Sequence, residues 1–180
     1  MRIRAIVVFA LYLFLTRTPS QSQTDDVPDT PSLGWVTLGL GLSGNRDFFG
    51  LTGNLSASYF SDLGLLRVRL VSATGFHGVE STTLSESRAS GLLELSGMYG
   101  LSHRTPDLLI SVSSGIGMLR VREHTPIGDK ESTIPGIPLE GELLLTPLPI
   151  VGIGITVFGN LNSKASYWGV LSSINLGKLW

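Results

Sequence analysis

Five charged side chains occupy the polar positions of stretches in which apolar and polar residues alternate. They are Arg67, Arg69, Glu94, Glu140 and Glu142. Side chains two residues apart on a β-strand point to the same side, so each i, i+2 pair shares one face. Paired carboxylates suit general acid–base catalysis, whereas arginines beside glutamates suit a buried ion-pair network or a charged gate.

A structural network is the interpretation that we favour for these five residues. No feature of the sequence places a substrate beside Glu140 and Glu142, and unpaired charges inside a protein are very costly. We therefore expect the arginines and glutamates to pair with one another and to fill an interior. A gate or proton-responsive pore is the alternative.

Alternation with a period of two runs through most of the chain after residue 34 and predicts eight β-strands. The expected strands span residues 35–43, 49–61, 65–76, 89–102, 108–122, 134–145, 150–160 and 167–180. We expect polar loops over residues 77–88 and 123–133. The alternation slips at residues 119–121, which indicates a bulge or an exit from a membrane.

Each expected strand has one aliphatic face and one face of small or polar residues. Leu38 and Leu40, for example, alternate with Gly39 and Gly41. A tilted strand needs roughly 9–11 residues to cross hydrocarbon, which these strands provide. An arginine facing lipid at the midplane costs about 2–4 kcal/mol, so we expect the aliphatic face outside and the charged residues inside.

Composition supports a membrane barrel of strands and excludes several other classes. The chain has 180 residues, no cysteine, 15% charged residues and a mean hydropathy of +0.29. Outside residues 1–22 it has no apolar run long enough for a spanning helix. The lack of cysteine excludes disulfides and cysteine-based metal sites, and a formal charge of −1 disfavours nucleic-acid binding.

The chain divides into three segments by composition. Residues 1–22 have two early arginines, an eleven-residue apolar core at 5–15 and small residues before a cleavage point, which is typical of a signal peptide. Residues 23–34 are acidic and contain prolines, so we expect a flexible periplasmic lead-in. Residues 35–180 are the expected barrel.

Aromatic residues cluster near the ends of the expected strands. Aromatic rings prefer the two membrane–water interfaces, so we expect them to form girdles around the barrel. The girdle residues that we expect are Trp35, Phe49, Tyr59, Phe76, Tyr99, Trp168 and Trp180.

In strand number, alternation, aromatic rims and terminal strand, the chain resembles the small eight-stranded outer-membrane β-barrel proteins of Gram-negative bacteria, a porin-like class. The resemblance covers residues 35–180 and implies an all-β, antiparallel, up-and-down transmembrane barrel in the cell outer membrane. It also implies that Ile174, Leu176 and Trp180 form the signal read by the barrel assembly machinery. Family members most often end in Phe, and this chain keeps an aromatic residue there.

We expect a monomeric integral membrane protein with a structural or surface-interaction role and a lumen plugged by side chains. No cofactor, metal ion or nucleic acid is expected. The expected partners are outer-membrane lipid and lipopolysaccharide, whose phosphates would meet basic residues near the outer rim. These basic residues are Arg88, Arg120, Arg122 and Lys130.

Three alternatives remain open at this point. One is a narrow gated channel, and another is a secreted lipocalin-like carrier with the leucine face inside. The third is a lipid A-modifying enzyme, which the resemblance makes worth testing. His77, His103 and His124 all lie in expected loops, and none has the His-x-Ser spacing of the deacylases of this class. We therefore expect no catalytic residues.

Overall fold

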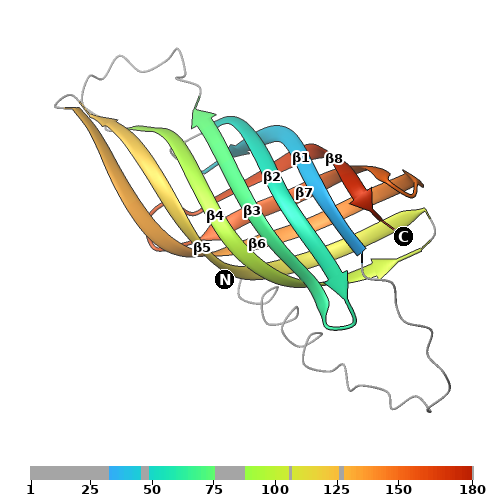
Figure 1. Cartoon of the computed structure of the whole chain (residues 1–180). Helices are drawn as coiled ribbons and strands as arrows, with labels where there is room; N and C mark the ends of the chain where they lie inside the picture. Colours follow the sequence, from blue (N-terminus) through green and yellow to red (C-terminus); the bar gives the residue numbers. More distant parts are fainter. Residues whose placement is uncertain (1–32, 46–48, 76–87, 106, 126–127, 180) are drawn as a thin grey trace, which may run out of the picture. The chain divides into compact units, whose positions relative to one another are not determined.

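Eight antiparallel strands close into one barrel in the computed structural model (Figure 1). The structure describes residues 33–45, 49–75, 88–105, 107–125 and 128–179. The strands are β1 (Leu33–Gly44), β2 (Phe49–Ser61), β3 (Gly64–Gly75), β4 (Arg88–Arg104), β5 (Leu108–Thr125), β6 (Gly128–Leu148), β7 (Val151–Leu161) and β8 (Tyr167–Lys178). Each strand pairs with the next along the chain, and β8 pairs with β1. In the described part of the chain, no helix has the length and hydropathy to cross a membrane.

The predicted fold class is confirmed, and so are most strand positions. The strand β1 begins at Leu33, inside the segment expected to be a lead-in, because Leu33 and Gly34 already pair with β2. The expected signal peptide at residues 1–22 and most of the lead-in at 23–34 lie outside the described residues.

The aliphatic face of the barrel points outward. Side chains in each strand alternate between buried and exposed, and the exposed members are mainly Leu, Ile and Val. Leu40 is 68% exposed and Ile116 is 80% exposed. This result contradicts the lipocalin-like alternative, which required the leucines to line the interior.

The loop expected at residues 123–133 is a prediction that was wrong. The strands β5 and β6 continue as a paired hairpin up to Thr125 and Gly128, as Figure 1 shows in yellow and orange. Residues 128–136 pair with β5 alone, because β6 meets β7 only from Ile137 onward. Opposite charges face one another across this hairpin at Arg122 and Glu131, and such pairs stabilise strands even where few residues are apolar.

The expected slip at residues 119–121 is also absent. The register of β5 with both neighbours is continuous there, and Leu119 and Val121 point inward while Arg120 points outward. The pattern changes at this point because the inward face becomes apolar and the outward face becomes charged. The strand itself keeps its phase.

All the connections at one end of the barrel are short, and we call it the turn end. The opposite end, which has longer connections as well as the short one between β5 and β6, is the loop end. At the turn end β2 and β3 are joined through Asp62 and Leu63. The backbone of Gly64 has a φ of +118°, a conformation that glycine adopts without steric cost. The Tyr99 hydroxyl donates a hydrogen bond to the Leu63 carbonyl and holds the turn against β4.

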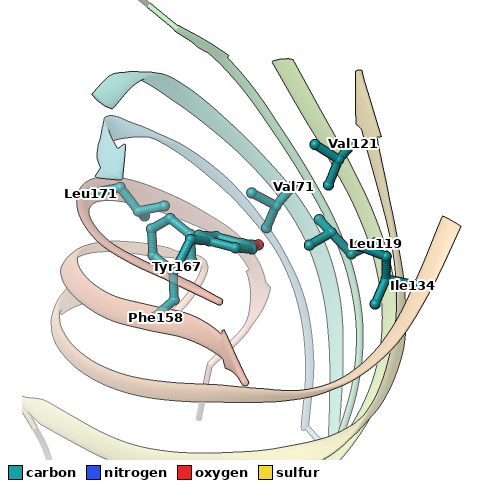
Figure 2. Close-up of a cluster of buried hydrophobic side chains, with 7 residues drawn as sticks. All are labelled: Val71, Leu119, Val121, Ile134, Phe158, Tyr167 and Leu171. Carbon is teal, nitrogen blue, oxygen red and sulfur yellow. The ribbon is translucent and has the colours of Figure 1, made fainter. Parts of the chain in front are cut away.

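Two apolar clusters lie inside the barrel at different heights. The turn-end cluster consists of Leu33, Trp35, Leu65, Leu109, Leu144 and Leu179. The loop-end cluster, drawn in Figure 2, consists of Val71, Leu119, Val121, Ile134, Phe158, Tyr167 and Leu171. Along β3 and β6 the predicted charged residues lie between members of the two clusters. The interior is therefore apolar at each end and polar between.

Candidate functional site: the charged layer inside the barrel

Three strands bring the five predicted charged residues into the interior. β3 supplies Arg67 and Arg69, β4 supplies Glu94, and β6 supplies Glu140 and Glu142. All five are almost fully buried. The strands β3 and β6 are not neighbours in the sheet, so the barrel must close before their side chains can meet. We call these five residues the charged layer.

Arg67 binds two carboxylates from β6. Its Nη1 forms an ion pair with Glu140 Oε1, and its Nη2 donates to Glu142 Oε2 at 2.5 Å. Its Nε donates to the Ser58 hydroxyl at 2.8 Å, which anchors the guanidinium to β2. A planar guanidinium with its donors in a fixed fork suits this arrangement better than lysine would.

Arg69 joins β6 to β4. Its Nη1 donates to Glu140 Oε2 at 2.8 Å, and its Nη2 donates to Glu94 Oε1 at 2.5 Å. Glu140 therefore lies between the two arginines and binds one with each oxygen. The five side chains form one continuous chain of ion pairs in the order Glu142, Arg67, Glu140, Arg69, Glu94.

Three further residues contact the charged layer, and the sequence reasoning missed them. Asn160 Nδ2 and the Tyr167 hydroxyl donate to Glu94 Oε2 at 2.8 and 2.7 Å. The Phe158 ring lies 5.6 Å from Arg69 Cζ, close enough for a cation–π contact. It also meets the Tyr167 ring edge-on, with the ring centroids 6.0 Å apart. Both side chains are drawn in Figure 2.

A signal for these three residues was present in the alternation. Tyr167 shares the phase of Leu171, and Phe158 and Asn160 share the phase of Thr156, all of them inward positions. The sequence analysis expected aromatic residues near strand ends to lie at the rims, and Phe158 and Tyr167 are aromatic residues near strand ends. Inward phase is the more reliable guide, because side-chain direction in a regular strand follows strictly from position.

The described residues of the expected aromatic girdle lie on both faces of the barrel wall. Phe49, Tyr59, Tyr99 and Trp168 point outward, and Trp168 is 67% exposed. The prediction for Trp35 was wrong: this side chain is 3% exposed and packs inside the turn-end cluster. Its phase is that of the inward-facing Thr37, and a narrow barrel needs large side chains to fill its end.

The remaining predicted positions have different outcomes. Phe76 and Trp180 lie outside the described residues. Ile174 and Leu176 point outward on β8. The described segments contain no group of three or more His, Cys, Asp or Glu residues arranged to hold a metal ion.

The charged layer is arranged for ion pairing, because arginines engage all three carboxylates. His103 lies exposed at the turn end, whereas the side chains of His77 and His124 are not described. His103 is therefore not a partner of Glu140 or Glu142, which are buried inside the barrel. The geometry favours a structural network over acid–base chemistry.

Comparisons with known proteins agree on the fold. No protein-family model matches the chain, and no curated protein matches it. Among solved structures, Neisserial surface protein A superposes with a TM-score of 0.59 at 10% identity, covering 81% of this chain and 96% of that one. The attachment invasion locus protein Ail of Yersinia pestis has a TM-score of 0.56 at 12% identity, covering 82% and 97%.

The N-terminal β-barrel domain of Pseudomonas aeruginosa OprF is similar to the same degree. Its TM-score is 0.55 at 12% identity, with 82% of this chain and 99% of that domain covered. These three structures are small outer-membrane barrels, and the alignments span nearly all of each. The chain therefore has the fold of the small eight-stranded outer-membrane β-barrel proteins.

Proposed function

We propose that the protein is an integral outer-membrane barrel with a non-enzymatic, structural or surface-interaction role and a lumen filled by its own side chains. The observation that carries the proposal is the inversion of polarity across the wall. Aliphatic side chains cover the outside, and charged side chains are buried inside. Water would disfavour such a surface, whereas hydrocarbon would solvate it.

The distribution of polar groups supports the membrane location further. Within the middle of the strands, outward positions such as Leu55, Val68 and Val112 are aliphatic. The outward-facing charged residues Arg120, Arg122 and Glu131 lie at the loop end. A band of apolar surface with charges at its edge is the pattern that a hydrocarbon layer requires.

Cell fractionation combined with gel mobility tests this proposal. We expect the protein in the outer-membrane fraction, extracted only by detergent, with a mobility on gels that changes when the sample is boiled. The change arises because a closed barrel stays folded in detergent until it is heated. A soluble periplasmic protein with the same mobility before and after boiling would overturn the proposal.

Lipid phosphates are the partner that the loop end of β5 suits best. Outward positions on this strand change from Ile116 and Met118 to Arg120 and Arg122. Arg120 also forms an exposed ion pair with Glu131. Phosphate groups of lipopolysaccharide lie at the edge of the hydrocarbon layer, where such arginines can bind them through paired hydrogen bonds.

Copurification of lipopolysaccharide measures this contact. The double variant Arg120→Gln and Arg122→Gln should retain several-fold less lipopolysaccharide per barrel in mild detergent, because two guanidinium groups are lost. Lys164→Gln is the control, since Lys164 is an exposed cation in the connection between β7 and β8. If the native protein, the double variant and Lys164→Gln retain equal amounts of lipopolysaccharide, Arg120 and Arg122 are not lipid contacts.

Assembly and oligomeric state follow from the closed sheet. Each of the eight strands pairs with two neighbours, which supports a monomer. We propose that the terminal strand β8, with Ile174, Leu176 and the terminal Trp180, is read by the barrel assembly machinery. Outward-facing aliphatic side chains on β8 are available to such a partner before the barrel enters the membrane.

A further inference from the structure

The charged layer contains one more carboxylate than guanidinium. Its two arginines and three glutamates are the buried charged side chains among the residues that the structure describes. They leave a formal surplus of one negative charge between two apolar clusters. An uncompensated charge in such surroundings is strongly disfavoured, so the folded barrel must balance it.

The hydrogen bonds assign the surplus to Glu142. Both oxygens of Glu94 accept hydrogen bonds, and each oxygen of Glu140 binds an arginine. Glu142 Oε2 binds Arg67 Nη2 at 2.5 Å and the Ser111 hydroxyl at 3.5 Å. Glu142 Oε1 is buried and has no hydrogen-bond partner. It is thus the carboxylate oxygen of the charged layer that lacks compensation.

A second, independent observation lies on the neighbouring strand. Thr156 of β7 is directly opposite Glu142 of β6 in the register, and both side chains point into the barrel. Thr156 is 1% exposed, and its Oγ1 has no hydrogen-bond partner. Two buried oxygens therefore sit on adjacent strands at the same height without a hydrogen-bond partner, beside the surplus charge.

Charge and ligand type together define what these oxygens can bind. Carboxylate and hydroxyl oxygens are ligands for hard cations, but Ca²⁺ takes six to eight oxygens and usually several carboxylates. Here one carboxylate oxygen and one surplus charge are available. We propose that Glu142 Oε1 and Thr156 Oγ1 bind a monovalent alkali-metal cation of the size of Na⁺, which neutralises the charged layer.

Equilibrium unfolding in two salts tests the site. The barrel is unfolded with urea in detergent, in NaCl or in choline chloride at equal concentration and pH, so that ionic strength is the same. Choline is too large for an interior filled by side chains. A ligand that binds only the folded state multiplies the folding equilibrium constant by one plus the ratio of ligand concentration to Kd. We expect the folding equilibrium constant to be larger in NaCl than in choline chloride at the same concentration.

Matched variants locate the effect. Glu142→Gln removes the surplus charge and keeps an oxygen for Arg67, so it should lose the Na⁺ dependence and be at least as stable as the native protein in choline chloride. Thr156→Val should need a higher Na⁺ concentration for the same gain. Glu131→Gln is the control, because Glu131 is an exposed carboxylate at the loop end. It should keep the full dependence.

Several results would overturn the proposal. One is equal stability of the native protein in both salts, and another is Na⁺ dependence that persists in Glu142→Gln. A third is a native protein whose stability is independent of Na⁺ but rises at acidic pH, while that of Glu142→Gln does not. This result would show that a proton, and not a cation, neutralises the surplus negative charge. If Glu142→Gln fails to fold, Thr156→Val still decides, because a Na⁺ dependence that is unchanged in Thr156→Val would also overturn the proposal.

Discussion

At the scale of single residues, Glu140 connects the two halves of the charged layer. It is the glutamate that binds both arginines, through Oε1 to Arg67 and through Oε2 to Arg69. These contacts join β3 to β6 across the interior. Its neutralisation breaks both contacts, whereas Arg67 keeps its ion pair with Glu142 and Arg69 keeps its ion pair with Glu94.

Glu140→Gln should lower the free energy of unfolding by about 1.5–3 kcal/mol, the value of hydrogen bonds to charged groups, because each arginine keeps one carboxylate partner. Glu131→Gln is the matched control, because it breaks an ion pair with Arg120 that is largely exposed. Its expected loss is below about 1 kcal/mol. Urea unfolding of the barrel in detergent measures both values. Equal losses in the two variants would show that the buried pairs contribute no more than surface pairs do.

At the scale of elements, β8 has the most demanding position. It closes the barrel by pairing with β7 and β1, and it carries both outward aliphatic and inward polar residues. Ser173 and Asn175 face inward there, and Asn175 accepts a hydrogen bond from Thr37 of β1. The same strand therefore seals the sheet and is the one proposed to guide assembly.

Trp180→Ala should reduce the amount of folded protein in the outer membrane several-fold in cells. Refolding of the purified variant in detergent should be nearly unchanged, because the proposed loss is in recognition by the assembly machinery. Trp180→Phe retains an aromatic terminus and should restore membrane levels. If the alanine and phenylalanine variants reach the membrane equally well, the terminal aromatic plays no part in assembly.

At the scale of the whole molecule, the interior has three layers. The charged layer lies between the turn-end cluster and the loop-end cluster, so an ion crossing the barrel would meet apolar side chains on both sides of the charges. An eight-stranded barrel has an interior that side chains can fill. This layering supports the plugged lumen and disfavours the gated channel.

Planar bilayer recordings distinguish a plugged lumen from a channel. The native protein should give no discrete conductance steps. The variant in which Arg67, Arg69, Glu94, Glu140 and Glu142 all become glutamine leaves no unpaired charge in the layer and should also give none, because the two apolar clusters remain. Tyr99→Phe, which alters only the turn contact with Leu63, serves as a folded control. Conductance that rises when the charged layer is neutralised would favour the gated channel.

Much of this architecture could be predicted from the sequence because side-chain direction in a strand depends on position alone. The outward leucines and the inward Arg67 and Arg69 followed from alternation, whereas the up-and-down order of strands was what the family resemblance implied. Lipid imposes that alternation on every strand, since charged side chains cannot face it cheaply. The physical constraint is local and repeats, so a single sequence carries it.

The partners inside the barrel were decided only by the tertiary structure. Glu140 meets Arg67 and Arg69, and Glu94 meets Tyr167, because closure and strand stagger bring distant strands to one height. The inward position of Trp35 arises in the same way, from the need to fill one end of a narrow interior. Alternation determines the face on which a side chain lies, whereas closure of the sheet determines what that side chain contacts.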